Sequence, residues 1–430
     1  MNGRLLRVLG TGFGLAVILG AAVGGEILRL PGAVARLLPA PGWQLSAWAL
    51  GGAYAVLCAS LFAELGTRLP RTSGLTAFAD AALGPSAGFL VGWGDFLASA
   101  FTVGAYGLLA GTLLAERFSG PPRLWALGAV VGVSLLQWPG IRPAAWAQDG
   151  LSFVKTLLLG GLALGGLSLA GSHLPAPVVP PMPRPGLLAF VAAMQLVVFA
   201  YDNYYSAVYF GEEYTDVRRQ LPRSLLAGVG LVMALYLLLA WGMSRGLDPL
   251  TLTTAELPGA ALAARVFGPL GGSLTWGLML LALFSGMNAT LMIASRILLA
   301  LGREGDAWRG TLTVNQGGTP VTGLAVAVAL AVGGLALPSF EATIAFMNPF
   351  VLVNYGLSFL SLVVLRRRGQ GEADCFRAPG LPGTAMLAMG ISLLLLLGGL
   401  WAAPFLTGAA LGLMALAWPL KRWLGGPARN

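Results

Sequence analysis

Several ionisable side chains lie inside long apolar stretches of this sequence, among them Glu26, Arg29, Asp95, Lys155 and Asp202. An ionisable group in such a stretch is costly, so it usually pairs with an opposite charge, binds a charged guest or passes a proton. The acids and bases of this set could together hold a small charged molecule. They therefore point to binding and proton transfer as the chemistry that the chain could do.

The residue types that catalysis normally uses are scarce. The single histidine, His173, falls in a Pro-rich segment, and the scattered serines have no base at a suitable spacing. Cys58 lies in an apolar stretch and Cys375 in a basic loop, so neither a disulfide nor a metal site is expected. We predict that the chain is not an enzyme and that it holds no metal and no cofactor.

The elements that position the ionisable residues must lie in a lipid bilayer. Of the 430 residues, 57% are hydrophobic and 10% are charged, and the mean hydropathy is +0.78. A soluble domain has roughly 25% charged residues, so this chain lacks the polar surface that water requires. We predict an all-α integral membrane protein whose surface contacts membrane lipid.

The apolar stretches predict twelve membrane-spanning helices in one domain that covers residues 1–430. The Pro-rich stretch Pro175–Pro185 separates two halves, and Leu247–Val266 reads as an external loop that is helical in its second half. The predicted spans are, in chain order, 11–38, 43–67, 84–116, 122–140, 146–171, 186–213, 221–246, 269–302, 320–337, 340–366, 381–401 and 403–423.

The formal net charge of +9 is explained by membrane topology. The basic residues sit in short loops, with no basic face interleaved with aromatic residues, so nucleic acid is not an expected partner. They concentrate in segments such as Arg366–Arg368, which face the cytoplasm if the N-terminus does. Arg4 and Arg7 precede an apolar run without a cleavage pattern, which we read as the first span. We predict a multi-pass protein of the cytoplasmic membrane with both termini cytoplasmic.

Two of the predicted spans are interrupted. Span 1 has Gly24 and Gly25 followed by Glu26 at mid-membrane depth, and span 6 has the pair Asp202-Asn203, which is unfavourable inside a helix. They open two five-span halves, and interruptions at corresponding positions indicate an inverted-repeat transporter with its site at the breaks. Backbone groups freed at mid-depth can replace the water around a polar guest.

Simpler interpretations of these residues remain open at this stage. The glycines could serve only close helix packing. Glu26 and Arg29 could pair on one helical face. Asp95 fits an interhelical polar contact better than substrate binding. Lys155 could extend to the cytoplasmic face or pair with Asp149.

Four segments resemble the amino acid–polyamine–organocation superfamily of permeases, in order and over nearly the whole chain. Val23–Gly32 resembles the family's first-span pattern of Ile-Gly-x-Gly-Ile-Phe and a following Pro-Gly. The others are Ala63–Gly74, which resembles the loop after span 2; Phe199–Glu213 with Leu221–Arg223, which resembles span 6 and its loop; and Asn288–Arg296 with Gly302–Gly305, which resembles the end of span 8.

The resemblance implies the leucine-transporter fold, with repeats at about 11–171 and 186–366, extra helices at about 381–423, and alternating access. It places a substrate's carboxylate on span-1 amides and its amine on span-6 carbonyls, with Tyr204 as a gate; Glu26 and Arg29 are further gating candidates. The implied substrate-binding residues are Ala22, Gly24, Gly25, Glu26, Phe199, Ala200, Tyr201, Asp202 and Tyr204.

The resemblance also gives Lys155 a role. In sodium-independent relatives a span-5 lysine stands where sodium-coupled members hold an ion, between the span-1 break and span 8. Here Ser285 and Asn288 are the span-8 candidates for ion coupling. An ammonium replaces a sodium ion electrostatically and can release its proton. We therefore favour a functional lysine, with proton coupling or exchange.

The predicted function is transport of an amino acid or amine by a monomer or homodimer. Glu26 stands where the family usually has a second glycine, and Asn203 where a glycine is usual in span 6. An acid beside the carboxylate pocket would repel a plain zwitterion, which suggests a cationic substrate. The alternatives are a sodium-coupled symporter of another solute on the same fold, and a non-transporting membrane sensor.

Overall fold

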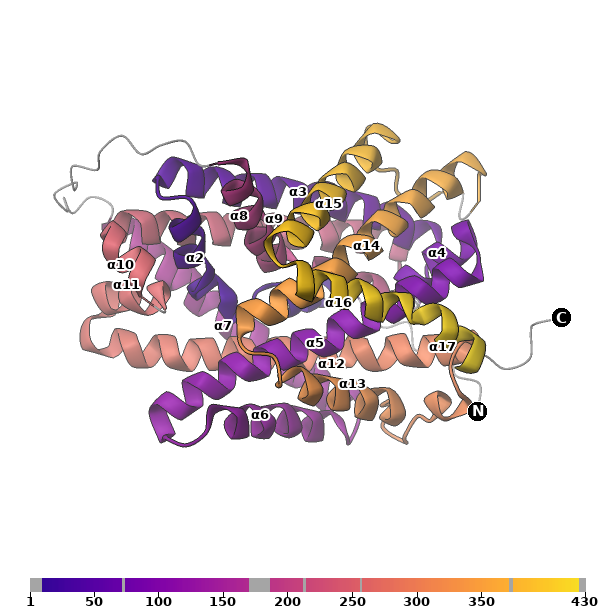
Figure 1. Ribbon diagram of the computed structural model, residues 1–430, viewed down its shortest axis with the longest axis horizontal. Helices are drawn as coiled ribbons and strands as arrows, with labels where there is room; N and C mark the ends of the chain where they lie inside the picture. Colours follow the sequence, from indigo (N-terminus) through magenta and orange to yellow (C-terminus); the bar gives the residue numbers. More distant parts are fainter. Residues whose placement is uncertain are drawn as a thin grey trace.

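The computed structural model describes residues 10–71, 74–169, 186–211, 214–255, 257–370 and 374–424. Within these ranges the regular elements are helices, and no strand is formed (Figure 1). The helices are α1 Thr11–Ala22, η1 Gly25–Leu28, α2 Leu30–Leu37, α3 Pro41–Arg68, α4 Leu75–Leu83, α5 Pro85–Phe118, α6 Pro122–Gln137, α7 Ile141–Leu169, α8 Leu187–Tyr201, η2 Tyr204–Phe210, α9 Val217–Gly246, α10 Pro249–Thr254, α11 Pro258–Phe267, η3 Gly268–Leu270, α12 Gly271–Arg303, η4 Arg309–Leu312, α13 Val321–Gly334, α14 Phe340–Arg367, α15 Gly383–Ala402, α16 Pro404–Ala415 and α17 Ala417–Leu424.

Eight helical segments among the described residues are long and apolar enough to cross a membrane. They confirm an all-helical membrane protein, while the prediction of twelve spans goes beyond this number. The apolar helices α6 and α13 have 16 and 14 residues, which is shorter than the roughly 20 that a perpendicular crossing needs. Predicted span 12 corresponds to two shorter helices, α16 and α17.

The long helices pack side by side, and three of them, α7, α9 and α12, contact α1. Helix α5 packs against α12, α6 and α14, and α3 packs against α9. Helix α1 contacts α7, α9, α12 and η2, so its end lies in the interior. In Figure 1, α10 and α11 lie at one end of the long axis, and α4 and α17 at the other. The short helices therefore cover the two ends of a bundle of long ones.

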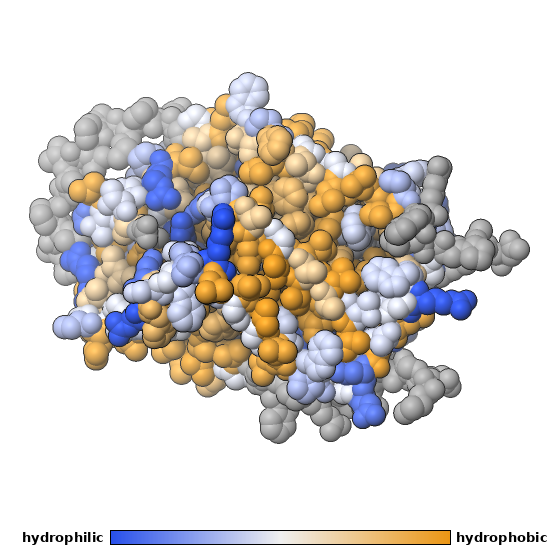
Figure 2. Space-filling view, turned by 60° about the horizontal axis from the view of Figure 1, so that its bottom comes forward, coloured by the Kyte–Doolittle hydropathy of each residue, from blue (hydrophilic) through white to orange (hydrophobic). Residues whose placement is uncertain are grey.

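The surface has the distribution expected of a membrane protein. In Figure 2, apolar residues cover the middle of the face, and hydrophilic residues gather mainly toward its left and right ends. Large apolar side chains are exposed on several helices, including Phe153 and Leu157 on α7 and Trp401 and Phe405 near the α15–α16 corner. Side chains of this kind are stable against lipid tails.

Local signals explain several helix starts. The side chains of Asp216 and Ser339 accept hydrogen bonds from the amides of Arg219 and Ala342, which caps α9 and α14. Asp248 caps α10 in the predicted external loop, where hydrogen bonds from Thr251 lower the pKa of the Asp248 carboxyl. That loop holds two short helices, α10 and α11, rather than one in its second half. Helix α4 was not predicted.

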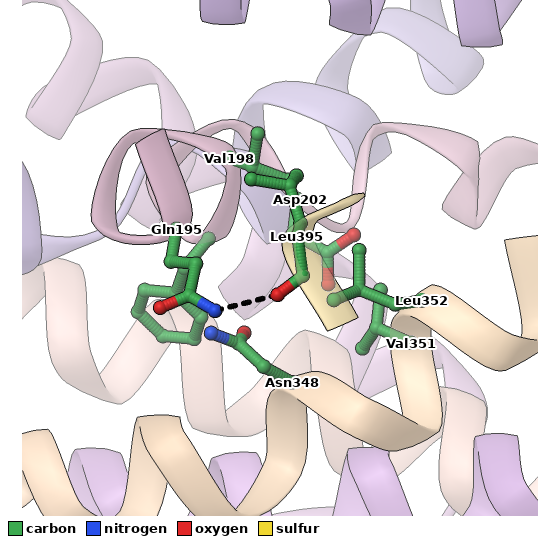
Figure 3. Close-up of a pocket in the computed structure, with 8 residues that line it drawn as sticks. Gln195, Val198, Asp202, Asn348, Val351, Leu352 and Leu395 are labelled. Carbon is green, nitrogen blue, oxygen red and sulfur yellow. Dashed lines mark hydrogen bonds between the residues drawn. The ribbon is translucent and has the colours of Figure 1, made fainter. Parts of the chain in front are cut away.

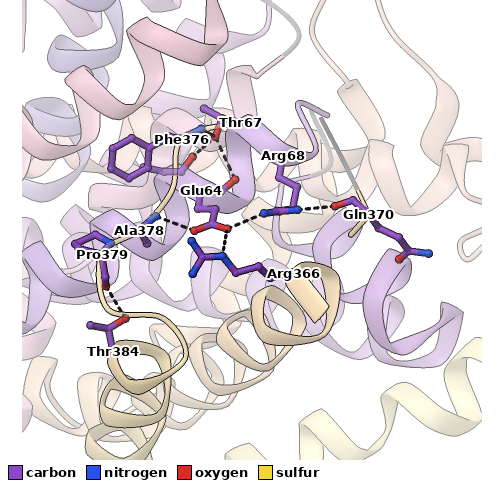
Figure 4. A network of polar contacts seen from close by, with 10 residues as sticks. Glu64, Thr67, Arg68, Arg366, Gln370, Phe376, Ala378, Pro379 and Thr384 are labelled. Atoms are coloured by element: carbon purple, nitrogen blue, oxygen red, sulfur yellow. Dashed lines mark hydrogen bonds and ion pairs between the residues drawn. The ribbon is translucent and has the colours of Figure 1, made fainter. Parts of the chain in front are cut away.

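A buried acid, Glu64, connects α3 to the end of α14 and to the loop before α15 (Figure 4). Its carboxylate contacts Arg68 Nη2 at 2.8 Å and Arg366 Nε at 3.3 Å, and it accepts a hydrogen bond from the Ala378 amide at 2.7 Å. Arg68 also donates to the Gln370 carbonyl at 2.8 Å. The acid is thus neutralised by two bases and serves as a structural tie.

Some predicted features lie outside the described residues. These are the Pro-rich stretch Pro175–Pro185 with His173, the pair Glu212-Glu213, and the side chain of Asp149.

Candidate functional site

The first interruption lies between α1 and η1. Helix α1 ends at Ala22, Gly24 is extended with φ −103° and ψ −179°, and helical backbone begins again at Gly25. The Ala22 carbonyl accepts a hydrogen bond from Tyr236 Oη at 2.8 Å, so this carbonyl is already occupied by α9. Gly25 packs closely on α12, because a Cβ placed there would lie 3.1 Å from Met279. The break is therefore held between two long helices.

The Glu26 carboxylate folds back over Gly24. A Cβ built on Gly24 would lie 1.9 Å from Glu26 Oε2 and 2.3 Å from Oε1, so only glycine leaves room for this approach. Glu26 is 2% exposed, and its Oε2 has no hydrogen-bond partner among the described residues. The Glu26 carboxylate thus covers the backbone at Gly24, and its Oε2 stays available to accept a hydrogen bond.

The second interruption lies between α8 and η2. Helix α8 ends at Tyr201, Asp202 is extended, and Asn203 adopts the left-handed conformation with φ 64°. Asparagine is among the few residues that adopt this conformation at moderate cost, which explains its presence where a glycine is usual. The chain then continues as η2, which contacts α1. The two breaks are therefore neighbours.

The predicted α8 residues point in different directions. Tyr201 donates a hydrogen bond to the Trp48 carbonyl at 3.2 Å and so faces α3. Phe199 packs edge-on against Phe340 with ring centroids 6.1 Å apart, and its carbonyl accepts from the Asp202 amide at 3.0 Å. Ala200 is buried. Their side chains serve packing, which leaves mainly backbone groups of this turn to meet a guest.

Asp202 is buried and accepts a hydrogen bond from Tyr355 of α14. Figure 3 shows Asp202 at the edge of a pocket that is lined also by Gln195, Asn348 and Leu395. The volume of this pocket is about 10 Å³, which is room for about one water. A larger guest at Asp202 therefore requires side chains to move.

Tyr204 lies in an aromatic cluster beside the second break. Its ring is 6.3 Å from Phe62, 6.0 Å from Tyr205 and 6.2 Å from Tyr355, measured between centroids. The Tyr204 hydroxyl is buried without a hydrogen-bond partner among the described residues.

Lys155 is wholly buried, with 0% of its surface exposed, so it does not extend to the membrane surface. Its Nζ donates a hydrogen bond to the Gly20 carbonyl in the last turn of α1 at 2.8 Å. Lys155 and Glu26 also interact electrostatically, although no ion pair within 4.0 Å joins them. The lysine therefore reaches the first break from α7.

A glutamine links the same region to α12. Gln148 Nε2 donates to Ser285 Oγ at 3.1 Å, and Asn288 Nδ2 donates to Gln148 Oε1 at 3.1 Å. A Cβ on Gly20 would lie 2.1 Å from Gln148 Nε2, so the glutamine also touches α1. Ser285 and Asn288 thus approach the first break through Gln148.

Arg29 does not pair with Glu26. Its Nη2 contacts Glu341 Oε1 at 2.7 Å, with the side chains 26% and 39% exposed. The interpretation of Glu26 and Arg29 as a local pair is therefore wrong, because a residue 312 positions away provides the partner. Asp95, in contrast, forms the interhelical contact that was favoured for it, accepting from Tyr205 at 3.0 Å and from Tyr209.

Sequence reasoning missed three residues of this centre. Gln148 and Tyr355 form hydrogen bonds with predicted site residues, and Glu341 pairs with one. Polar residues in predicted spans were a usable signal for all three, but their partners lie far away in the sequence.

Comparison with known proteins supports this picture of the chain. A model of the family described as amino acid permease matches residues 13–417. The chain is similar to the serine/threonine exchanger SteT of Bacillus subtilis, with 24% identity over 90% of this chain and 89% of that protein. It is similar to the human b(0,+)-type amino acid transporter 1, with 24% identity over 84% of this chain and 76% of that one. It is also 26% identical to the human Asc-type amino acid transporter 1 over 82% of this chain and 70% of the relative.

These relatives are transporters and exchangers rather than enzymes. Since the family model covers nearly the whole chain, the protein belongs to the amino acid permease family.

Proposed function

We propose that the protein is a secondary active transporter, which carries an amino acid or amine across the cytoplasmic membrane by alternating access. The observation that carries this proposal is the pair of neighbouring helix interruptions with a buried, unpartnered polar atom beside each, Glu26 Oε2 and Tyr204 Oη. An unsatisfied buried group costs about 1–3 kcal/mol, which a polar guest can recover. The relatives, which are two amino acid transporters and a serine/threonine exchanger, support the same class of substrate.

The proposed membrane fold has twelve spans as two inverted five-span repeats and two extra helices. Every predicted span range contains at least one helix, which supports this assignment. The predicted repeats, at about 11–171 and 186–366, each begin with an interrupted helix. The position of α17 and of α10–α11 at opposite ends of the bundle supports cytoplasmic termini and an external α10–α11 loop (Figure 1).

The proposed binding centre lies between the breaks. At the first break it consists of Ala22, Gly24, Gly25 and Glu26. At the second it consists of Phe199, Ala200, Tyr201, Asp202 and Tyr204. Interrupted helices at membrane depth supply backbone donors and acceptors there.

The proposed coupling residues are Lys155, Ser285 and Asn288. Because Lys155 holds a charge at the first break through Gly20, a change in its protonation alters the electrostatics beside Glu26. This arrangement supports the proposal of sodium-independent transport with proton coupling or exchange. Gln148 joins the set as the residue that connects α12 to α1.

The proposed gates are Tyr204 and Glu26 at the centre and Arg29 with Glu341 outside it. Tyr204 closes the aromatic side of the second break. The Arg29–Glu341 pair joins the segment after the first break to α14, whose Tyr355 contacts Asp202. A partly exposed ion pair of this kind is weak enough to open.

The function is tested with purified protein in liposomes. Labelled amino acids and amines are supplied outside, with and without unlabelled substrate inside, in sodium-free buffer. We expect saturable uptake that does not need sodium and that is stimulated by internal substrate or by a proton gradient. A strict requirement for sodium, or binding without flux, would contradict the proposed mode.

A further inference from the structure

More acids than bases are buried at the centre. Among the described residues, the buried charged side chains are Glu26, Glu64, Arg68, Asp95, Lys155 and Asp202. Glu64 is neutralised by Arg68 and Arg366 at the edge of the bundle. Three acids then face one lysine around the breaks, and none of these acids forms an ion pair within 4.0 Å among the described residues.

The acids differ in how far the protein already satisfies them. Asp95 accepts hydrogen bonds from two tyrosines, Tyr205 and Tyr209. Asp202 accepts one from Tyr355. Glu26 Oε2 has none among the described residues, although it is buried. Because a buried carboxylate oxygen without a partner is costly, a cationic guest that reaches this oxygen of Glu26 is stabilised, while backbone groups at Gly24 and Glu26 already contribute hydrogen bonds to the carboxylate.

Within the part of the chain that the structure describes, neither base near the centre is free to receive a second carboxylate. Lys155 already donates to the Gly20 carbonyl, and Arg29 is held by Glu341. The Glu26 carboxylate covers Gly24, so a carboxylate brought to the same backbone would meet a like charge at close range. Like charges placed together in a dry site are unfavourable by several kcal/mol or more at separations of about 4 Å.

Aromatic rings complete the surroundings. Tyr236 donates a hydrogen bond to the Ala22 carbonyl at the first break, and Tyr204 lies beside the turn at Asp202 with its hydroxyl lacking a hydrogen-bond partner among the described residues. Aromatic faces attract ammonium groups, most strongly where water is excluded. The acids supply charge for a cation, and the rings supply a surface for its carbon skeleton.

We propose that the binding centre selects a protonated amine that lacks an α-carboxylate, with the carboxylate of Glu26 as the partner of the ammonium group. This inference rests on the proposed transport function and narrows its substrate class. An amine without a carboxylate keeps the attraction to Glu26 and Asp202 and avoids the repulsion. The carboxylate of Glu26 thus takes the place at the first break that a substrate carboxylate would need.

The test uses pairs of compounds that differ in the carboxylate. The probes are lysine with cadaverine, arginine with agmatine, and serine with ethanolamine; lysine methyl ester keeps the lysine skeleton without the negative charge. Thermal stability of the purified protein and flux into liposomes are measured for each probe, because a ligand that binds the folded state raises the melting temperature. The wild-type protein should prefer each amine over its amino acid by at least about tenfold, a difference of about 1.4 kcal/mol.

Three variants separate the causes. Glu26→Gly removes the carboxylate and opens the break, and Glu26→Gln removes the carboxylate at similar size; both should shift the ratio toward the amino acids by at least about tenfold. Asp95→Asn is the matched control, since it removes a buried acid that two tyrosines already satisfy, and the ratio should stay as in the wild type.

The possible results distinguish the two proposals. Flux of amino acids equal to or above that of amines in the wild type would overturn the substrate inference and leave transport intact. An unchanged ratio in both Glu26 variants would also overturn it. If no probe raises the melting temperature or enters the liposomes with the wild-type protein or any variant, the proposed function fails, and the inference fails with it.

Discussion

Lys155→Met separates a coupling role of the lysine from a structural one. The wild-type side chain is fully buried and donates one charged hydrogen bond, to Gly20 O at 2.8 Å. Such a bond contributes about 1.5–3 kcal/mol. Keeping the ammonium group out of water costs several kcal/mol in the other direction. Methionine has a similar length and no charge, so the substitution removes both the hydrogen bond and the cost of burying the ammonium group. Because these two effects have opposite signs, the free energy of unfolding should change by less than about 2 kcal/mol.

Transport should respond much more strongly. Without the ammonium group, Lys155 can no longer bind and release a proton beside Gly20 and Glu26. We expect sodium-free flux in liposomes to fall by at least about tenfold, the equivalent of about 1.4 kcal/mol. Lys155→Ala should show the same loss of flux together with a lower melting temperature, because truncating a long buried side chain typically costs about 2–5 kcal/mol.

The matched control is Lys421→Met. Lys421 is partly exposed and pairs with Asp306 at 3.3 Å, at the end of the bundle that carries α17. Its flux should equal that of the wild type. Wild-type flux in Lys155→Met would refute the coupling role. A decrease in flux that is fully explained by a smaller amount of folded protein would refute it too.

Three further predictions concern single contacts. Asn203→Ala should lower stability by about 1–2 kcal/mol because its φ is 64°, whereas Asn203→Gly should not, as thermal melts would show. Glu64→Gln should cost about 3–5 kcal/mol, since it leaves two arginines without their buried acid; an unchanged melting temperature contradicts this. Arg29→Ala should change stability by under about 1 kcal/mol but speed exchange, and exchanging the charges of Arg29 and Glu341 should restore the wild-type rate; equal rates in all three proteins would exclude a gate.

The local features of the fold were predictable because their signals are local. Runs of apolar residues predicted where helices lie, and the helix ends at Ala22 and Tyr201 fall within the segments that glycines and the Asp-Asn pair had marked. Asn203 shows how far such reasoning goes. The sequence showed that asparagine stands where the family usually has glycine, but it did not show that this residue adopts the left-handed backbone conformation.

The partners of the polar residues could not be read from the sequence. Arg29 pairs with a residue 312 positions away, although Glu26 stands three residues from it. Asp202 meets Tyr355 of another helix, 153 positions along the chain. Spacing along one helix favours near neighbours, whereas the packing of separate helices decides which long-range pair forms. Helix α4 was missed because nine residues carry too little periodicity to stand apart from a loop.

The two ion pairs of α14 give this helix unequal anchors. Glu341 and Arg366 stand 25 residues apart on it, which at a rise of about 1.5 Å per residue separates them by about 37 Å. At Arg366 the partner is a wholly buried acid that also holds a second arginine and a main-chain amide. At Glu341 the partner is a single, partly wetted arginine. Because the ion pair at Arg366 is buried and the one at Glu341 is partly exposed, α14 would move more at its Glu341 end than at its Arg366 end. Tyr355, which contacts Asp202, lies between the two ends and would move with the helix.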